Sequence, residues 1–418
     1  MGYHVLWVNN ILPEEPARRL STKSSPMGGW LMSMADEVIK NENVSISIAS
    51  PGPVQKITKI VGEKYDYYVF PQKKHKNSDY WKWVIGDCKP DIVHLNGTEY
   101  NYTNNIYDAL NNEKIVISIQ GLISECWKYY YGMLTIKDIV LNLTFKDIIN
   151  RSDIFHARNN MKKNGKYEIQ KLKRANIIIG RTDWDYAACL KNGVEKKYRS
   201  VNENLRESFY KKRWEFDKCK KRQIFCSQGA VPYKGIHILF EALTILKNRF
   251  PDVELVIAGY NLVNENSFWD RVKRTGYAKY LKAMIEKNNL SSHIRFTGLL
   301  EEDEMCDQYI NANVFVQSSF IENSPNSLGE AIALGMPIVA SLVGGTEKYI
   351  EHKRDGFLYP AGDSNMLALY ISYIFENSSL AQRIADNVYE RRMEFYDKEI
   401  NSKKLVSIYN ELIEEKGE

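Results

Sequence analysis

Short apolar runs rich in Val and Ile alternate along the chain with longer stretches that space apolar and polar residues as a helix does. Nearly continuous apolar runs are typical of strands buried on both faces, so this alternation predicts parallel sheets covered by helices. The strands expected in the first half are 4–10, 44–50, 66–71, 91–97, 114–121 and 175–182. Those expected in the second half are 223–229, 253–260, 293–300, 313–319 and 337–341.

A polar segment at residues 211–222 separates the two series of strands. Right-handed crossovers between parallel strands give doubly wound sheets, which bind ligands beyond the carboxyl ends of their strands. We therefore expect an α/β protein with two Rossmann-like domains facing each other across a cleft. The N-terminal domain is expected over residues 1–210 and the C-terminal domain over residues 211–399. The amphipathic segment from about residue 400 to residue 418 is expected to form a helix that packs on the first domain.

Positive charge is concentrated in the first half of the chain. Residues 1–222 contain 37 Lys and Arg against 25 Asp and Glu, whereas residues 223–418 contain 20 against 27. Clusters of Lys and Arg bind anionic lipid surfaces. The N-terminal half is therefore expected either to contact an anionic membrane peripherally or to present an ordinary solvated surface. Nucleic acid is not expected as a partner, because no DNA- or RNA-binding motif accompanies the charge.

The composition, with 44% hydrophobic and 26% charged residues, is that of a globular protein. No uninterrupted apolar run approaches the ~20 residues that cross a bilayer. The six cysteines are scattered without a CxxC pair, which favours free thiols in a reducing compartment. Together with a strand-like beginning that has no basic leader, these features predict a cytoplasmic protein, either free or held at the inner membrane face.

The most informative polar residues lie in segment 318–341. Glu322 and Glu330 flank a turn-rich loop that leads from an expected strand into an expected helix. Ser327 and Glu330 have the spacing of a capping box, so Glu330 either caps its own helix or faces a ligand. A helix that begins at the carboxyl end of a strand offers free backbone N–H groups, and its dipole favours a phosphate there. A carboxylate accepts hydrogen bonds and can hold both hydroxyls of a ribose.

These two glutamates form a Glu-x7-Glu motif, which is followed by AIALGMPIVAS and GGTEKYIEHKRDGFLYPAGD and preceded by VPYKGIHILFEAL and FTGLLEEDEM. These segments resemble the donor-binding half of glycosyltransferase family 4, the retaining enzymes of the GT-B fold. DIVHLNGTEYN, ISIQGL, IIGRTDWD and NENLRESFY are similar to the branch that builds capsular polysaccharide, exopolysaccharide and lipopolysaccharide.

The resemblance implies roles for residues of the second domain. Glu322 is similar to the glutamate that contacts the donor sugar near its anomeric carbon, and Glu330 to the glutamate that binds the ribose. Lys234 is similar to the lysine that neutralises the departing phosphate, where a fixed cation acts on the transition state; the alternative is a solvated turn lysine. Gly298 belongs to the turn expected beside the nucleotide base. The backbone amides expected at the diphosphate are those of Asn326, Ser327 and Leu328.

In the first domain, Gly28 and Gly29 either let the backbone approach the same phosphates or form an ordinary loop. Gly229 stands where relatives usually place an arginine, five residues before the lysine. One phosphate cation is therefore absent or comes from elsewhere. Arg181 either supplies that charge from the first domain or forms an ion pair at a helix end.

Gln120 replaces the usual histidine of the family and cannot titrate, so its expected catalytic role is to orient a hydroxyl or to stabilise charge by hydrogen bonding. His94, at the end of an expected strand, is expected to be structural. Asp183 and Asp185 resemble the metal-binding DxD motif of another glycosyltransferase fold, but at the start of a helix they are expected to cap it. We therefore expect metal-independent chemistry without a cofactor, the nucleotide sugar being a substrate.

The resemblance implies a hexosyltransferase-type enzyme that moves a sugar, with retention, from a nucleotide-diphosphate sugar to a glycan or a lipid-linked oligosaccharide in surface polysaccharide biosynthesis. The expected donor is a UDP-sugar. Two alternatives remain, namely a nucleotide-sugar-binding partner without turnover and a sugar-nucleotide epimerase of similar fold. The aromatic and basic segments 81–83 and 128–134 either meet lipid or sugar rings or pack as partly buried core aromatics.

Overall fold

The computed structural model of the protein describes residues 2–23, 28–71, 78–227, 229–264, 272 and 274–414. The chain forms two compact units. The first comprises Met1–Ser124, Asn164–Glu207 and Phe395–Glu418, and the second comprises Glu125–Lys163 and Ser208–Glu394. The change of unit after Glu207 lies close to the boundary expected at residue 210. The segment Glu125–Lys163, expected in the N-terminal domain, groups with the second unit instead.

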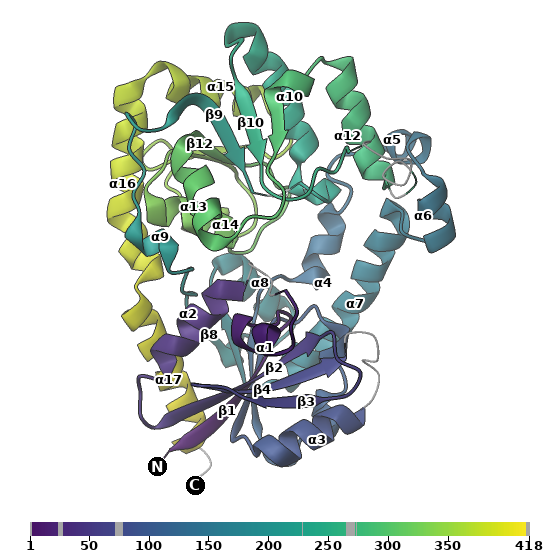
Figure 1. The fold of residues 1–418 in the computed structure, drawn as a ribbon, viewed down its shortest axis with the longest axis vertical. Helices are drawn as coiled ribbons and strands as arrows, with labels where there is room; N and C mark the ends of the chain where they lie inside the picture. Colours follow the sequence, from purple (N-terminus) through teal and green to yellow (C-terminus); the bar gives the residue numbers. More distant parts are fainter. Residues whose placement is uncertain are drawn as a thin grey trace. The chain divides into compact units, whose positions relative to one another are not determined.

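The first unit contains an eight-stranded sheet in the order β3-β4-β2-β1-β5-β6-β7-β8. Figure 1 labels strands β1 to β4 of this sheet. Its strands are β1 (Tyr3–Val8), β2 (Val44–Gly52), β3 (Thr58–Val61), β4 (Asp66–Pro71), β5 (Ile92–Asn96), β6 (Lys114–Ser118), β7 (Ile177–Gly180) and β8 (Tyr198–Ser200). Neighbouring strands are parallel except β3 and β4, which are antiparallel. The six expected strands are all present, whereas β3 and β8 were not expected.

This sheet is buried on both faces, as the apolar runs predict. Successive residues of β1 point to opposite sides, so that Leu6 and Val8 belong to one apolar cluster and Val5 and Trp7 to another. Helices cover the two faces. Those of the first unit are α1 (Glu14–Arg19), α2 (Gly29–Val38), α3 (Ser78–Cys88), α8 (Asp183–Lys191) and α17 (Lys398–Glu414), and α4 (Ile123–Cys126) and α7 (Ile154–Arg174) have residues in both units.

The second unit contains a six-stranded parallel sheet in the order β11-β10-β9-β12-β13-β14. Its strands are β9 (Lys220–Cys226), β10 (Glu254–Ile257), β11 (Ile294–Phe296), β12 (Ala312–Gln317), β13 (Ile338–Ser341) and β14 (Phe357–Tyr359). Its helices are α5 (Ile136–Leu141), α6 (Phe145–Asn150), α9 (Ser208–Lys211), α10 (Ile236–Arg249), α12 (Gly276–Lys287), α13 (Glu302–Asn311), α14 (Asn326–Leu334), α15 (Ser364–Glu376) and most of α16 (Ser378–Tyr396). Five strands were expected, and β14 was not.

Specific contacts hold the segment 125–163 in the second unit. The His237 ring, on α10, hydrogen-bonds through Nε2 to the carbonyl oxygen of Gly132 at 2.7 Å. The backbone N–H of Gly276, at the start of α12, donates to Asp147 Oδ2 at 2.7 Å. These partners are far from the segment in sequence, so the basic surplus of the first half does not map onto a single unit.

Two expectations about the chain as a whole can be compared with the structure. All six cysteines are free thiols, as their scattered positions predict. In the described part of the chain, no helix combines the length and the apolar character needed to span a bilayer.

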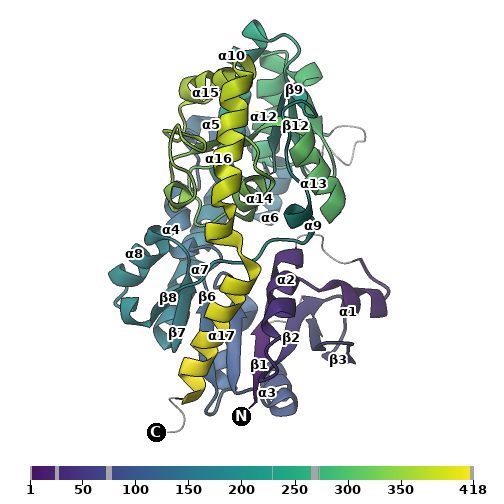
Figure 2. The ribbon, with the colours of Figure 1, turned by 90° about the vertical axis from the view of Figure 1, so that its left-hand side faces the viewer.

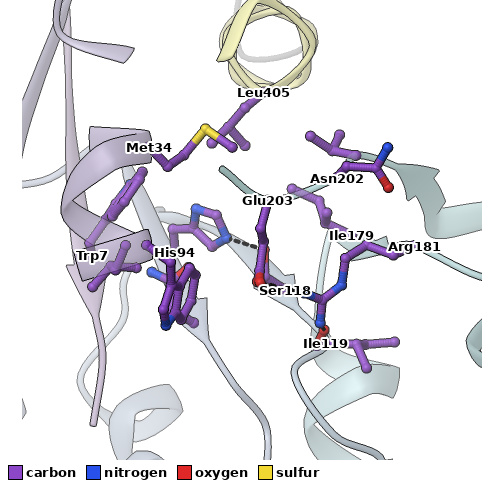
Figure 3. A pocket seen from close by; sticks show the side chains of 14 residues that line it. Trp7, Met34, His94, Ser118, Ile119, Ile179, Arg181, Asn202, Glu203 and Leu405 are labelled. Atoms are coloured by element: carbon purple, nitrogen blue, oxygen red, sulfur yellow. Dashed lines mark hydrogen bonds and ion pairs between the residues drawn. The ribbon is translucent and has the colours of Figure 1, made fainter. Parts of the chain in front are cut away.

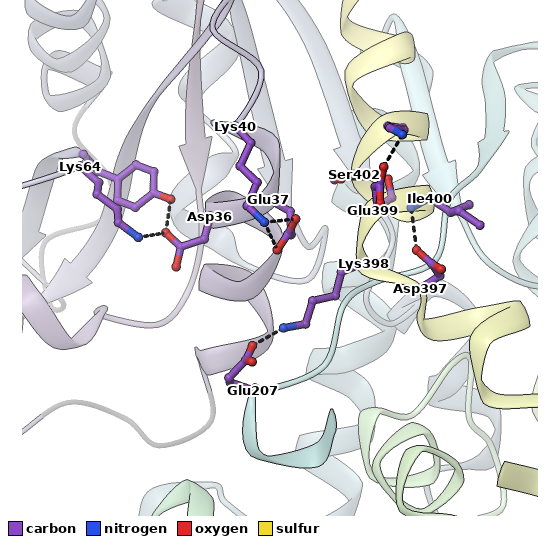
Figure 4. Close-up of polar contacts among 12 residues, drawn as sticks. Asp36, Glu37, Lys40, Lys64, Glu207, Asp397, Lys398, Glu399, Ile400 and Ser402 are labelled. Atoms are coloured by element: carbon purple, nitrogen blue, oxygen red, sulfur yellow. Dashed lines mark hydrogen bonds and ion pairs between the residues drawn. The ribbon is translucent and has the colours of Figure 1, made fainter. Parts of the chain in front are cut away.

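Helix α17 packs against the sheet of the first unit and places Tyr409 in its core (Figure 2). The Tyr409 hydroxyl accepts a hydrogen bond from Trp7 Nε1 at 3.0 Å and lies 2.5 Å from Nδ1 of His94. Asp397 immediately precedes the helix, and its Oδ1 accepts the N–H of Ile400 at 2.9 Å (Figure 4). The first residue of the helix, Lys398, is ion-paired with Glu207.

We expect Tyr409→Phe to lower the free energy of unfolding by about 1–3 kcal/mol, because it leaves the Trp7 N–H and a His94 nitrogen buried without their partner. Chemical denaturation followed by tryptophan fluorescence measures the loss. Tyr186→Phe is the matched control, since Tyr186 of the same unit is 42% exposed. Equal stability of the two variants would contradict the role given to the Tyr409 hydroxyl.

Candidate functional site

The sheet of the second unit reverses its winding between β9 and β12. From β9 the chain continues to β10 and β11 on one side, and from β12 to β13 and β14 on the other. In doubly wound sheets, ligands bind outside the carboxyl ends of the strands at such a point. Most of the residues implicated by sequence in this unit follow these strands.

Lys234 and Glu322 meet at this point. Lys234 ends the short 3₁₀ helix Pro232–Lys234 after β9, and Glu322 lies in the loop after β12. The Lys234 ammonium lies 2.6 Å from Glu322 Oε1, which also accepts the Ser319 hydroxyl at 2.6 Å. Glu322 Oε2 has no hydrogen-bond donor among the described residues. The pair therefore holds a cation at the end of the sheet and leaves one carboxylate oxygen available.

Two glycines allow the loops to approach closely enough for this contact. Gly235 has φ +69°, and a Cβ atom there would clash with the carbonyl oxygen of Ser318. Gly344 has φ +51°, and a Cβ atom there would clash with the carbonyl oxygen of Glu322. That same oxygen accepts the N–H of Gly345 at 3.0 Å. Any larger residue at position 235 or 344 would push the loops apart.

Helix α14 begins two residues earlier than an N-cap at Ser327 would place it. Its N-cap is Pro325, without a side-chain cap, so the capping box of Ser327 and Glu330, one of the two alternatives for this segment, is wrong. A proline ring fixes φ at a value compatible with the start of a helix, and this places Ser327 inside the first turn. The amides of Asn326 and Ser327 have no acceptor among the described residues. The Leu328 amide, expected at the diphosphate, donates to the Pro325 carbonyl at 3.0 Å.

Glu330 lies in the middle of α14 and is 6% exposed. Burial raises the pKa of the Cys306 thiol on α13 to about 12, and the Glu330 carboxylate contributes to that rise. Because Pro325 is the N-cap of α14 and no side chain caps it, Glu330 does not cap its own helix. Its role in ribose binding stays a prediction.

In the first unit, Gln120, Arg181 and Glu203 form one buried polar group beyond the ends of β6, β7 and β8. Arg181, 3% exposed, is ion-paired with Glu203 and donates to the Ile119 carbonyl oxygen at 2.6 Å. The Gln120 amide donates to the same carboxylate. Burial raises the pKa of Glu203, while Arg181 and Gln120 lower it. Of the two alternatives for Arg181, a phosphate-binding cation or an ion-paired arginine, the structure shows the ion pair.

A small cavity of the first unit adjoins this group (Figure 3). Its lining combines the Arg181–Glu203 pair with Trp7, His94 and Leu405. At the neighbouring strand ends, the buried amide nitrogens of Asn9 and Asn96 have no hydrogen-bond partner in the described structure. Buried polar groups are rarely left without partners, so these amides are suited to bind a polar ligand.

His94 is structural, as expected. It lies within β5, is 1% exposed, and its Nε2 is 2.7 Å from the Ser118 hydroxyl. Burial lowers the pKa of His94 to about 3, because the charged imidazolium is costly away from water. At neutral pH the ring is uncharged and locked between two hydroxyl groups.

Residues 208–391, which lie in the second unit but do not include its segment 125–163, match the family model described as "Glycosyl transferases group 1". Residues 208–391 belong to this family. Among curated relatives, this chain is 29% identical to amylovoran biosynthesis glycosyltransferase AmsK of Erwinia amylovora over 32% of its length and 31% of that protein. It is 28% identical to capsular polysaccharide biosynthesis glycosyltransferase CapM of Staphylococcus aureus over 44% of each chain. The matches thus span less than half of these relatives.

Solved structures extend the similarity of fold beyond residues 208–391, which we call the transferase domain. Sucrose-phosphate synthase from Thermosynechococcus elongatus superposes with a TM-score of 0.72 at 16% identity, covering 98% of this chain and 99% of that one. HepE from Anabaena in complex with UDP-glucose gives a TM-score of 0.66 at 14% identity, covering 98% and 100%. The fold is therefore GT-B, with two Rossmann-like units, as the resemblance implied.

Gly298 is the remaining glycine predicted for the donor site in this unit, and its place beside a nucleotide base stays a prediction. Gly298 follows β11 with φ +80° and forms an antiparallel bridge with Gly259, which follows β10. A Cβ atom at Gly298 would face open space, so its positive φ, and not crowding, requires glycine. At Gly229 a Cβ atom would lie 3.3 Å from the Ile236 side chain, which leaves little room for the arginine of relatives.

Gly28 and Gly29 form the N-terminus of α2, after β1. Gly28 has an ordinary right-handed φ of −91°, and a Cβ atom there would lie 2.7 Å from the Ile11 side chain. Close packing of the loop therefore accounts for the glycine at 28 within the unit itself. The approach of these two residues to phosphates stays a prediction.

The DxD-like pair caps a helix, as expected. Asp185 forms a capping box with Thr182 at the start of α8, and its Oδ2 accepts the Arg181 N–H at 2.8 Å. Asp183 lies in the same first turn. Within the described ranges, no group of three or more His, Cys, Asp or Glu residues is placed to hold a metal ion.

Sequence reasoning did not name four residues described above, namely Ser319, Glu203, Asn9 and Asn96. Ser319, which holds Glu322 by its hydroxyl, carries no signal beyond its position after a strand. Glu203, the partner of both Gln120 and Arg181, lies in the polar stretch NEN after a short polar strand that was itself missed. A long-range charge pair of this kind becomes visible only once the strand order is known.

We expect Arg181→Ala to destabilise the protein by about 3–5 kcal/mol, because it leaves the Glu203 carboxylate buried without its cation. Arg181→Met combined with Glu203→Leu removes both charges and should restore most of that loss. Thermal and chemical denaturation measure both variants. An arginine that served only donor phosphate would instead give an Arg181→Ala protein of unchanged stability and weakened nucleotide binding.

Proposed function

We propose that the protein is a retaining, hexosyltransferase-type glycosyltransferase that moves a sugar from a UDP-sugar to a glycan or lipid-linked oligosaccharide in surface polysaccharide biosynthesis. The contact between Lys234 and Glu322, beside the unengaged amides of Asn326 and Ser327, carries the proposal. The ammonium follows β9 and the two N–H groups follow β12, the two strands between which this doubly wound sheet reverses, and such positive groups suit a diphosphate. The family of residues 208–391 and the polysaccharide glycosyltransferases AmsK and CapM agree with it.

The leaving group is stabilised by these fixed positive groups. As the bond between the anomeric carbon and the diphosphate oxygen breaks, its electron pair moves to that oxygen, and Lys234 and the amides of Asn326 and Ser327 offset the charge. The acceptor hydroxyl attacks the anomeric carbon on the same face, and its proton passes to the departing phosphate oxygen. The products are the nucleoside diphosphate and a glycoside of retained configuration.

The two glutamates orient the donor. The unengaged Oε2 of Glu322 is suited to accept a hydroxyl of the sugar, while its Oε1 keeps Lys234 in place. Glu330 is proposed to hold the ribose hydroxyls from α14. Neither carboxylate needs to give up or take a proton in this scheme, and no metal ion is proposed.

The acceptor is proposed to bind in the first unit. The unpartnered amides of Asn9 and Asn96 offer hydrogen bonds to sugar hydroxyls. Gln120 is proposed to orient the attacking hydroxyl, held in turn by Glu203. The UDP-glucose bound by HepE, a structure of the same fold, supports the choice of a uridine donor.

Incubation with a panel of sugar nucleotides tests this function. A glycosyltransferase without its acceptor releases the nucleoside diphosphate and free sugar slowly from one donor, and EDTA should not change the rate. Interconversion of the sugar with the nucleotide still attached would instead identify an epimerase. Tight donor binding with no product in the presence of polysaccharide acceptors would identify a non-catalytic partner.

We expect Lys234→Ala to lower turnover about 100-fold or more while donor affinity falls less than about tenfold, because charge on the diphosphate grows only as the bond breaks. Steady-state rates and calorimetric donor binding separate the two effects. Lys218→Ala is the matched control, since it removes an exposed lysine paired with Glu215 in the same unit. Equal losses in turnover and affinity would show that Lys234 contributes only ground-state binding.

We expect Glu330→Ala to weaken nucleotide binding several-fold and to leave the melting temperature nearly unchanged, since the structure gives this residue no capping role. Ser327→Ala should likewise leave the melting temperature unchanged, because its hydroxyl caps nothing. Differential scanning fluorimetry with and without UDP measures both effects. A large drop in the melting temperature of both variants would contradict the structure and show that Ser327 and Glu330 form a capping box.

A further inference from the structure

Helices α5 and α6 expose an unusual number of large apolar side chains. Phe145 is 79% exposed, and Ile148 and Ile149 lie beside it on the same face of α6 at the helical spacing i, i+3 and i+4. The apolar patch is defined here as Met133, Ile136, Val140, Leu141, Phe145, Ile148 and Ile149, each at least half exposed. Soluble proteins rarely gather so many exposed apolar residues in one place unless the surface binds something.

The aspartate of α6 points inward. The Asp147 carboxylate is 1% exposed and accepts the N–H of Thr144 at 3.2 Å, the Ser152 hydroxyl at 3.2 Å and the Gly276 N–H at 2.7 Å. Asp138 closes a second capping box with Thr135. An ordinary surface helix turns its apolar face to the core and its charged face to water, whereas α6 does the reverse.

The patch is held on a fixed base. The Lys279 ammonium, on α12, donates to the Leu141 carbonyl oxygen at 3.1 Å, and the Thr144 hydroxyl donates to the Arg274 carbonyl oxygen at 3.1 Å. Figure 1 shows α5 and α6 at the margin of the second unit beside α12. The apolar side chains are therefore presented by an ordered structure and not by a frayed loop.

The charge around the patch is positive. Lys137 and Arg151 are exposed and have no ion-pair partner among the described residues, and Lys146 lies between them in sequence. The acidic residues of the two helices, Asp138 and Asp147, are both engaged in capping boxes. Apolar side chains bordered by lysine and arginine are typical of helices that lie in the surface of an anionic membrane.

We propose that α5 and α6 dock the protein on an anionic lipid bilayer by inserting the apolar patch among the acyl chains. The positive charges of Lys137, Lys146 and Arg151 beside the patch favour an anionic bilayer as its partner, because they complement anionic head groups. A symmetric contact with a second copy would bring like charges together. This inference locates membrane contact on a specific surface of the second unit and does not depend on catalysis.

Flotation of the full-length protein with vesicles tests the proposal. The vesicles contain phosphatidylcholine alone or phosphatidylcholine with an equal part of phosphatidylglycerol. Phe145→Ser combined with Ile149→Ser should lower the partition coefficient for anionic vesicles at least about tenfold, since two apolar side chains lose their burial. Ile245→Ser combined with Met393→Ser, two residues each 43% exposed elsewhere in this unit, is the control and should not change it.

The charged border gives a second readout. Lys137→Gln combined with Arg151→Gln should lower binding to anionic vesicles and leave binding to neutral vesicles unchanged, and ~1 M salt should have the same effect by screening. Equal binding by the Phe145/Ile149 variant and the parent would overturn the proposal. So would a dimer that the parent forms without lipid and this variant does not, because a second copy would then cover the patch. Donor binding by every variant shows separately that the transferase domain is intact.

Discussion

The close approach of two loops at the centre of the second sheet is the constraint on which the proposed donor site depends. β9 and β12 are neighbours, and the chain leaves their carboxyl ends in opposite directions. Gly235 and Gly344 remove the two Cβ atoms that would separate the loops, and this lets the Lys234 ammonium reach Glu322. Backbone geometry thus fixes the cation in place, and in the proposed reaction a cation held in this way lowers the cost of reorganisation when charge develops.

Some polar groups of each unit are satisfied by protein partners and others are not. In the first unit, Arg181, Glu203 and Gln120 satisfy one another and His94 is locked between hydroxyl groups. The amide nitrogens of Asn9 and Asn96 in the same unit have no partner in the described structure. In the second unit, the amides of Asn326 and Ser327 and one oxygen of Glu322 have no partner among the described residues. Unsatisfied groups near strand ends are suited to a ligand, whereas satisfied ones mainly fix the loops.

The apolar patterns of the strands explain how far the sequence could be read. All eleven expected strands are present because buried parallel strands need continuous apolar runs, and these runs stand out. β8 and β14 were missed because each has only three residues, too few to show a pattern of apolar and polar positions. β3 was missed because its half-buried pattern depends on antiparallel pairing with β4. Lys234 and Glu322 could be named because motifs flank them, but the contact between them follows only from the strand order.

Local patterns failed where a neighbour outside the pattern decided the structure. Ser327 and Glu330 have the spacing of a capping box, yet Pro325 starts the helix and moves both residues inward. Asp147 shows the opposite case: a capping aspartate usually faces water, but here it also accepts the Gly276 N–H from α12 and is buried. Once that carboxylate points into the unit, the geometry of α6 leaves Phe145, Ile148 and Ile149 on the outer face. The exposed apolar surface is therefore a consequence of the buried position of Asp147. That position depends on Gly276, which is far from α6 in the sequence, so the local sequence around α6 cannot predict it.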